Sequence, residues 1–146
     1  MTTLLVMEGP EKTGKTEIAK TLATRLNVPY YKDRWQKQKS PLVLQLWDFL
    51  SQTNYSAILD RDFPSYYVYY RYYGLDIHPN FYVVDRLAAS LGVRIVICHK
   101  TRYSSYEDEV PLEANAKLFD LYKEFSIQTK CRSCFLDTTS EDLEDE

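Results

Sequence analysis

A lysine and a threonine that follow a glycine-rich turn stand at the spacing that binds a phosphate group. Residues 9–16 read Gly-Pro-Glu-Lys-Thr-Gly-Lys-Thr and satisfy the pattern G-x-x-x-x-G-K-[ST]. Such a loop points backbone N–H groups at one anion, while its lysine reaches the β- and γ-phosphates and its hydroxyl binds Mg²⁺. The sequence therefore predicts a site for a nucleoside triphosphate and Mg²⁺. The residues expected to hold the nucleotide are Gly9, Thr13, Gly14, Lys15 and Thr16, with Thr16 also a metal ligand.

The segments on both sides of this loop have the patterns that the motif requires. An apolar run, Leu4 to Met7, precedes the loop and is typical of a buried strand. Residues 15–26 follow it with apolar side chains at helical spacing. A strand that turns into a helix through this loop is the context that distinguishes a phosphate site from a chance match in a turn.

A second group of polar residues follows another short apolar strand, residues 57–60. It begins with Asp60 and Arg61, and Ser65 and Tyr69 lie five and nine positions past Asp60. A carboxylate here can hold Mg²⁺ directly or through water, and an arginine can clamp a second phosphate with two hydrogen bonds. In isolation the pair could equally be a helix-start aspartate and a surface arginine. A parallel sheet would place it on the same rim as the glycine loop, which favours a functional role.

Strands and helices alternate along the whole sequence, which predicts an α/β fold. The expected strands are 3–8, 28–31, 57–60, 93–98 and 133–137, and the expected helices are 15–26, 41–52, 65–73, 79–91 and 111–125. Such alternation gives a parallel sheet with helices on both faces and right-handed crossovers. We therefore predict a P-loop NTPase-type three-layer α/β/α fold with a five-stranded parallel sheet and a short lid. Residues 1–146 are expected to form a single domain, with 138–146 a solvated acidic tail.

Composition limits the classes of protein to which this chain can belong. It has 146 residues, 45% of them hydrophobic and 27% charged, with a net charge of −3. This balance argues against a general nucleic-acid binder, and no apolar run is long enough to span a membrane. The three cysteines are an odd number, which favours reduced thiols and a cytoplasmic location. A single C-x-x-C pair, Cys131 and Cys134, is a weak signal for metal or redox function.

The two polar groups together resemble the thymidylate kinase family. The likeness lies in Met7-Glu8-Gly9-Pro10-Glu11-Lys12-Thr13-Gly14-Lys15-Thr16 and in Leu59-Asp60-Arg61-Asp62-Phe63-Pro64-Ser65, followed by Tyr69. It is closer to the short thymidylate-kinase-like nucleotide kinases of bacteriophages, and a phage-encoded protein would be located in the host cytoplasm. A looser likeness extends to residues 105–109 and 121–125.

This resemblance implies transfer of the γ-phosphoryl group of MgATP to a deoxynucleoside monophosphate, a pyrimidine such as dTMP. It implies that Arg61 grips the acceptor's phosphate and that Asp60 organises Mg²⁺. Tyr69 would lie under the sugar and favour deoxyribose, and Glu11 would contact the acceptor's 3′-hydroxyl and Mg²⁺. Lys12 falls where one class of the family has a catalytic arginine, and it would add positive charge beside the transferred group.

The sequence also departs from the family pattern. Only residues 99–110 fill the place of a longer lid, and Arg102 is the expected lid cation, with Lys100 as second choice. Trp47 and Phe49 are candidates to stack on the acceptor's base, but the arginine usual four residues on is absent. The identity of the base therefore stays open.

Residues 66–73 contain six tyrosines, and Tyr66, Tyr69, Tyr70 and Tyr73 share one stripe of a helix. Packing with one or two contacts to a base or sugar is the favoured interpretation, ahead of a homodimer face and of nucleic-acid stacking. Arg71 is a further candidate to contact the acceptor.

Three other functions remain open at this stage. A deoxynucleoside kinase would phosphorylate a 5′-hydroxyl and would benefit from a base such as Glu8. The Asp60-Arg61 pair, rather than Glu-Arg, favours a monophosphate acceptor. A phage kinase acting on a modified base in DNA is a second alternative. The short lid motivates the third, a nucleotide-binding regulator with weak catalysis.

Overall fold

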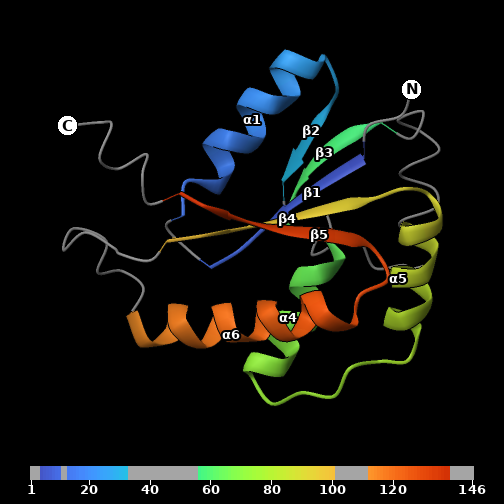
Figure 1. Ribbon diagram of the computed structural model, residues 1–146. Helices are drawn as coiled ribbons and strands as arrows, with labels where there is room; N and C mark the ends of the chain where they lie inside the picture. Colours follow the sequence, from blue (N-terminus) through green and yellow to red (C-terminus); the bar gives the residue numbers. More distant parts are fainter. Residues whose placement is uncertain (1–3, 11–12, 33–55, 101–111, 139–146) are drawn as a thin grey trace.

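Five parallel strands form the middle layer of the protein (Figure 1). The computed structural model describes residues 4–10, 13–32, 56–100 and 112–138. The strands lie side by side in the order β2-β3-β1-β4-β5, and every neighbouring pair is parallel. Their bounds are β1 Leu4–Glu8, β2 Tyr30–Lys32, β3 Ala57–Asp60, β4 Arg94–His99 and β5 Arg132–Asp137. The predicted α/β fold with a five-stranded parallel sheet is confirmed.

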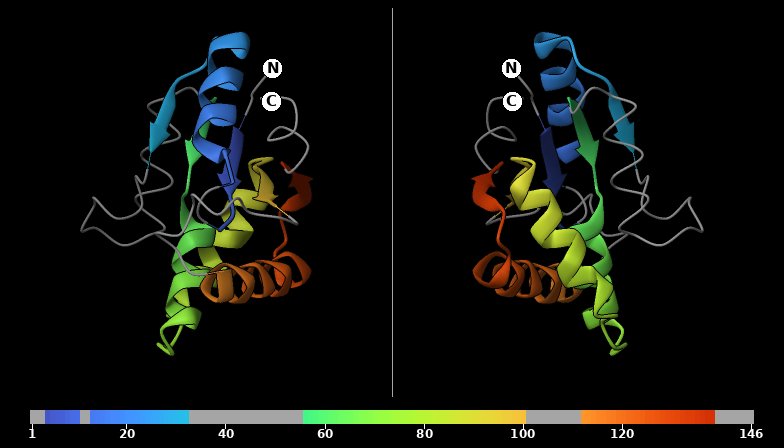
Figure 2. Two further views of the ribbon diagram at one scale, coloured as in Figure 1. Left: turned by 90° about the vertical axis from the view of Figure 1, so that its left-hand side faces the viewer. Right: turned by 90° about the vertical axis from the view of Figure 1, so that its right-hand side faces the viewer.

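Helices cover both faces of this sheet (Figures 1 and 2). Helix α1 packs on one face, while α4, α5 and α6 lie on the other side. The bounds are α1 Lys15–Leu26, α4 Phe63–Tyr72, α5 Asn80–Ser90 and α6 Leu112–Gln128. This gives the predicted three layers, because each parallel crossover must return across a face of the sheet.

Each face of the sheet has its own apolar core. Met7, Ile58 and Cys98 point toward α1 and pack with its Ala19 and Ala23. The larger core lies on the opposite face and contains mostly aliphatic and aromatic side chains from β1, β3 and β4 and from the three helices. Its largest fully buried members are Tyr67, Tyr122, Phe63, Phe81 and Phe125. Because side chains alternate along a strand, both cores draw on the same three central strands.

The central strands bring the ends of β1 and β3 to one edge. Strand β1 lies between β3 and β4, with Met7 opposite Asp60 and Glu8 opposite Ile97. The carboxyl ends of parallel strands are where ligands bind in open α/β sheets. The register therefore places the two polar groups found in the sequence on one rim.

The bounds of the elements differ from the predictions by a few residues. Helix α1 begins and ends where we predicted, whereas α6 continues three residues beyond the predicted end at 125. Helix α4 begins at Phe63 rather than at residue 65, with Pro64 in its first turn. Proline suits that turn because its missing N–H has no partner there in any case. The predicted helix 41–52 and the predicted lid lie outside the described residues, except for His99 and Lys100.

Thr138 belongs with the sheet rather than with the acidic tail. Its side chain is buried, and its backbone N–H donates to the carbonyl of His99 at 2.8 Å. The other residues of the predicted tail, 139–146, lie outside the described part of the chain.

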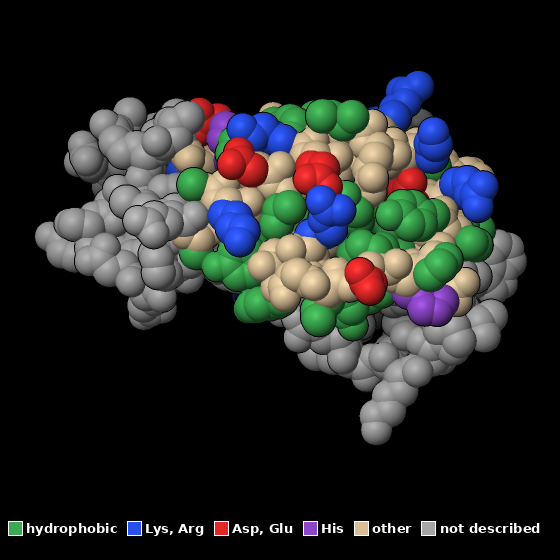
Figure 3. All heavy atoms as spheres, turned by 90° about the horizontal axis from the view of Figure 1, so that it is seen from below, with side chains coloured by type: hydrophobic (Ala, Val, Ile, Leu, Met, Phe, Trp, Pro, Cys, Tyr) green, Lys and Arg blue, Asp and Glu red, His purple; other side chains and the backbone are tan. Residues whose placement is uncertain are grey.

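The helical face of the protein mixes apolar and charged side chains (Figure 3). Several large apolar residues are exposed in the described chain, among them Tyr73, Leu75, Tyr82 and Ile127. Within the described residues, no helix has the length and hydrophobicity that a membrane-spanning segment needs.

Candidate active site

The phosphate loop joins β1 to α1 through two glycines with positive φ. Gly14 stands at the N-terminus of α1 with a φ of 76°, and no described side chain caps this helix end. The first N–H groups of a helix have no partner within the helix, and the aligned peptide dipoles add partial positive charge there. The end of a 12-residue helix is therefore presented to an anion.

Gly9 is required by close packing as well as by its backbone angle. Its φ is 138°, and a Cβ built at this position would lie 2.1 Å from the carbonyl oxygen of Cys98 on β4. No side chain fits at that distance. The loop thus leaves the sheet in direct contact with the neighbouring strand, and its path depends on glycine.

Asp60 receives hydrogen bonds from three side chains, two on α1 and one on β2. The Thr16 hydroxyl donates to its Oδ2 at 2.7 Å, the Tyr30 hydroxyl donates to the same oxygen at 2.6 Å, and the Lys15 ammonium pairs with Oδ1. Burial by itself raises the pKa of the Asp60 carboxyl, but the hydrogen bonds and the charge of Lys15 outweigh it and hold that pKa below its usual value. Asp60 is therefore an ionised carboxylate beside the Thr16 hydroxyl.

Arg61 is held in an unusual backbone conformation at the end of β3. Its φ is 64°, in the left-handed region, and its N–H donates to the carbonyl of Met7 at 2.9 Å. The guanidinium donates through Nη1 to the hydroxyl of Tyr122 at 3.1 Å and lies 5.5 Å from the centre of the Tyr69 ring. Only 7% of Arg61 is exposed. Left-handed geometry in a non-glycine residue persists where the surroundings enforce it, as they do here.

Glu8 lies beneath Arg61 and is fully buried. Its carboxylate accepts hydrogen bonds from the Asp62 N–H and the Ser65 hydroxyl, both at 2.7 Å, and from the Tyr122 hydroxyl at 2.8 Å. Burial raises the pKa of Glu8, and the charge of Arg61 opposes that rise. Burial and the nearby Glu8 also raise the pKa of Tyr122 well above its usual value. These contacts make Glu8 a support of the site.

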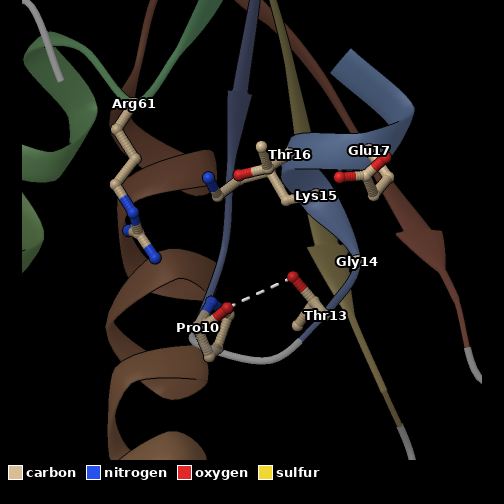
Figure 4. Close-up of a pocket in the computed structure, with 7 residues that line it drawn as sticks. All are labelled: Pro10, Thr13, Gly14, Lys15, Thr16, Glu17 and Arg61. Carbon is tan, nitrogen blue, oxygen red and sulfur yellow. Dashed lines mark hydrogen bonds between the residues drawn. The ribbon is translucent and has the colours of Figure 1, made fainter. Parts of the chain in front are cut away.

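The phosphate loop and Arg61 line one cavity of about 180 Å³ (Figure 4). Its lining residues are Pro10, Thr13, Gly14, Lys15, Thr16, Glu17 and Arg61. The Thr13 hydroxyl donates to the Pro10 carbonyl at 3.2 Å and so closes part of the loop. Lys15 extends into this space from the start of α1, and Arg61 from the end of β3 (Figure 4). Two cations and a helix N-terminus give the cavity the charge that phosphate groups require.

Thr16 and Asp60 are suitable ligands for Mg²⁺. Both offer oxygen atoms, and the 2.7 Å between Thr16 Oγ1 and Asp60 Oδ2 places them side by side. Mg²⁺ is usually held by one or two carboxylates together with substrate phosphates and water. The described residues contain no cluster of three or more His, Cys, Asp or Glu side chains that could hold a metal by themselves. The donor set thus fits a metal that arrives with a nucleotide.

Other predicted site residues have different positions. Ser65 donates its hydrogen bond to Glu8 and does not line the cavity. Arg71 pairs with Glu124 of α6 at 2.8 Å and lies 5.8 Å from the Tyr67 ring centre, away from the lining residues. Tyr69 is connected to the cavity through its contact with Arg61. The remaining candidates lie outside the described residues; they are Glu11, Lys12, Trp47, Phe49 and Arg102.

The tyrosine stripe of α4 is used mainly for packing. Tyr66 is almost completely buried, packs against Tyr70 with ring centres 4.1 Å apart, and accepts a hydrogen bond from the His78 N–H. Tyr73, by contrast, is 68% exposed. The stripe therefore fixes α4, which carries Tyr69 against Arg61.

Comparison with known proteins supports the fold. No protein-family model and no curated protein match this sequence. Among solved structures, the YorR protein from Bacillus subtilis in complex with phosphorylated GDP matches with a TM-score of 0.72 and 19% identity, over 98% of this chain and 92% of that one. Thymidylate kinase from Ehrlichia chaffeensis matches with a TM-score of 0.55 and 16% identity, over 93% and 87%. The chain has the fold of the P-loop nucleotide kinases.

Sequence reasoning missed Tyr30 and Tyr122 as parts of the site. The sequence points to Tyr122 only through the loose family likeness at 121–125, and to Tyr30 only as part of a predicted strand. Both act through hydroxyl groups that reach residues distant in sequence, Asp60 and Arg61. One signal in the sequence could have found them: a tyrosine in a buried strand or helix has a hydroxyl group that usually needs a hydrogen-bond partner.

Proposed function

We propose that this protein is a nucleotide kinase that transfers the γ-phosphoryl group of MgATP to a deoxynucleoside monophosphate, with a pyrimidine such as dTMP as the expected acceptor. One observation carries the proposal. The same cavity is lined by Lys15 and Thr16 of the phosphate loop and by Arg61, which follows β3. A phosphate held by each side would place donor and acceptor in one space.

We assign a role in this reaction to each site residue that the structure describes. Lys15 binds the β- and γ-phosphates of ATP, and Thr16 and Asp60 hold Mg²⁺. When bound, Mg²⁺ neutralises charge on the β- and γ-phosphates. Arg61 binds the acceptor's phosphate, and its planar guanidinium can do so with two parallel hydrogen bonds. Tyr69, whose ring faces Arg61, lies beside the acceptor's sugar.

The roles implied for residues outside the described part complete the proposal. Glu11 contacts the acceptor's 3′-hydroxyl, Lys12 and Arg102 add positive charge around the transferred group, and Trp47 and Phe49 stack on the base. Phosphoryl transfer needs mainly alignment and charge stabilisation, which these side chains supply.

Burial of Glu8 favours a monophosphate acceptor over a nucleoside. A kinase that acts on a 5′-hydroxyl benefits from a base within hydrogen-bond reach of that hydroxyl. Glu8 has no exposed surface and accepts hydrogen bonds from Asp62, Ser65 and Tyr122. It is therefore unsuited to take a proton from a substrate.

A substrate panel tests the proposal directly. Purified protein is incubated with MgATP and each common nucleoside, ribonucleoside monophosphate and deoxynucleoside monophosphate, and the products are separated. Guanine nucleotides are included because the structural neighbour YorR was solved with phosphorylated GDP. We expect diphosphate products, with deoxy acceptors used faster than ribo acceptors. Replacing Tyr69 by Ala should reduce this sugar preference.

Two variants make the panel interpretable. Lys15→Ala should abolish turnover, whereas Lys123→Ala removes a lysine that is 52% exposed on α6 and should leave turnover unchanged. Product from nucleosides but not from monophosphates would contradict the proposal. Nucleotide binding without any product would instead indicate a regulator with this fold.

A further inference from the structure

Tyr30 reaches the candidate metal site from the edge strand of the sheet. The register pairs Tyr30 with Ile58 and Lys32 with Asp60. The backbone of Tyr30 therefore lies two residue positions before Asp60, or roughly 6.6 Å along the strand direction. The long phenol side chain spans this distance, and its hydroxyl donates to Asp60 Oδ2 at 2.6 Å. A shorter polar side chain at this position would not reach the Asp60 carboxylate.

The ring of Tyr30 is held in place before it reaches Asp60. It is half-buried and packs against the small core beneath α1, which contains Met7, Ile58 and Ala19. The Lys20 ammonium lies 5.9 Å from the ring centre. Contacts along the ring therefore fix the direction of the hydroxyl.

Two of the three donors to Asp60 have second tasks in the proposed reaction. Lys15 binds the phosphates of ATP, and the Thr16 hydroxyl binds the metal. Both tasks draw these groups away from their hydrogen bonds with the Asp60 carboxylate. The proposed reaction gives Tyr30 no contact with the nucleotide, so its hydrogen bond to Asp60 persists.

We infer that Tyr30 is a positioning residue that keeps Asp60 directed at Mg²⁺ while Lys15 and Thr16 engage the nucleotide. This inference rests on the proposed function. Groups that hydrogen-bond to a metal ligand fix its orientation, and their loss typically costs about 10–100-fold in metal affinity or activity. Tyr30 has this relation to Asp60.

The test measures how nucleotide binding depends on the metal, without turnover. A non-hydrolysable ATP analogue is titrated into wild-type protein and Tyr30→Phe by calorimetry, first with a chelator and then over a series of Mg²⁺ concentrations. Tyr30→Phe removes one hydroxyl and keeps the packed ring. We expect the Mg²⁺ concentration for half-maximal enhancement of binding to rise at least tenfold, and affinity without metal to change less than twofold.

Tyr31→Phe is the matched control. It removes a hydroxyl from the next residue of the same strand, whose side chain points to the opposite face of the sheet. Its metal dependence should equal that of the wild type. Thermal unfolding of both variants verifies that each is folded.

The outcomes separate this inference from the proposed function. An unchanged metal dependence in Tyr30→Phe overturns the inference, and so does an equal loss of affinity with and without Mg²⁺, which would show a purely structural role. Wild-type protein that binds no nucleotide would overturn the proposed function, and the inference with it.

Discussion

Replacing Tyr122 by Phe removes the hydroxyl that joins Arg61 to Glu8. The Tyr122 hydroxyl donates to Glu8 Oε1 at 2.8 Å and accepts from Arg61 Nη1 at 3.1 Å, and the residue has no exposed surface. A phenylalanine ring fits the same space but makes neither hydrogen bond. The change therefore tests whether this bridge holds Arg61.

The size of the effect follows from those two hydrogen bonds. A hydrogen bond to a charged group contributes about 1.5–3 kcal/mol, and Glu8 keeps its bonds from Asp62 and Ser65. We therefore expect the free energy of unfolding to fall by about 2–4 kcal/mol. For a chain of this size that is a drop in Tm of roughly 5–15 °C, which leaves a protein of ordinary stability folded.

The same change should weaken binding of the acceptor more than binding of ATP. Arg61 loses a contact that orients it, so we expect the KM for the monophosphate to rise about tenfold. The affinity for the ATP analogue should change less than twofold, because the nearest contacts of Lys15 and Thr16 are with Asp60.

Urea denaturation and steady-state kinetics with the best acceptor measure both effects. Tyr73→Phe, which removes a hydroxyl from a side chain that is 68% exposed, serves as control and should behave like the wild type. A Tyr122→Phe protein with unchanged stability and unchanged KM for the acceptor would refute the claim that the Tyr122 hydroxyl holds Arg61 in place.

The remaining predictions concern the phosphate loop and the thiols. Gly9→Ala should lower stability by roughly 3 kcal/mol or more and abolish ATP binding, since its Cβ would overlap the Cys98 carbonyl. Gly92→Ala, with positive φ but no described atom within 4 Å of its Cβ, should cost about 1 kcal/mol, and equal losses in circular-dichroism melts would contradict the packing argument. Burial and the nearby Asp85 raise the pKa of Cys131 to about 12, so its contribution to stability should persist below pH 9 and be lost as pH rises toward 12. Iodoacetamide at pH 9 should modify the exposed Cys134 at least tenfold faster than Cys131 by peptide mapping, and similar rates would contradict that assignment.

The order of the elements could be predicted because the signals for it are local. The run from Val93 to Cys98 is almost wholly apolar and β-branched, and residues 94–98 lie in β4, one of the three central strands. The helix start predicted at Ser65 is wrong by two residues, because α4 begins at Phe63, ahead of Pro64. The Ser65 side chain donates a hydrogen bond to Glu8.

The candidate site could be predicted only where its residues stand in one motif. The phosphate loop is one continuous segment, and Asp60 and Arg61 are neighbours in sequence. The loop and Arg61 line the cavity, and Asp60 contacts Lys15 and Thr16 of the loop. The partners of Glu8 lie 54, 57 and 114 residues away, and Tyr30 is 30 residues from Asp60. Such contacts depend on strand order and helix packing, which a single sequence does not specify.

In the proposed reaction, the two substrates would contact different layers of the protein. Helix α1 would bind the triphosphate on one face of the sheet, whereas Arg61 is held from the opposite face by Tyr69 of α4 and Tyr122 of α6. An altered choice of acceptor can therefore arise in one layer while the other keeps its grip on ATP. Laboratory selection for a new acceptor should accumulate substitutions in α4 and α6 and spare the first helix.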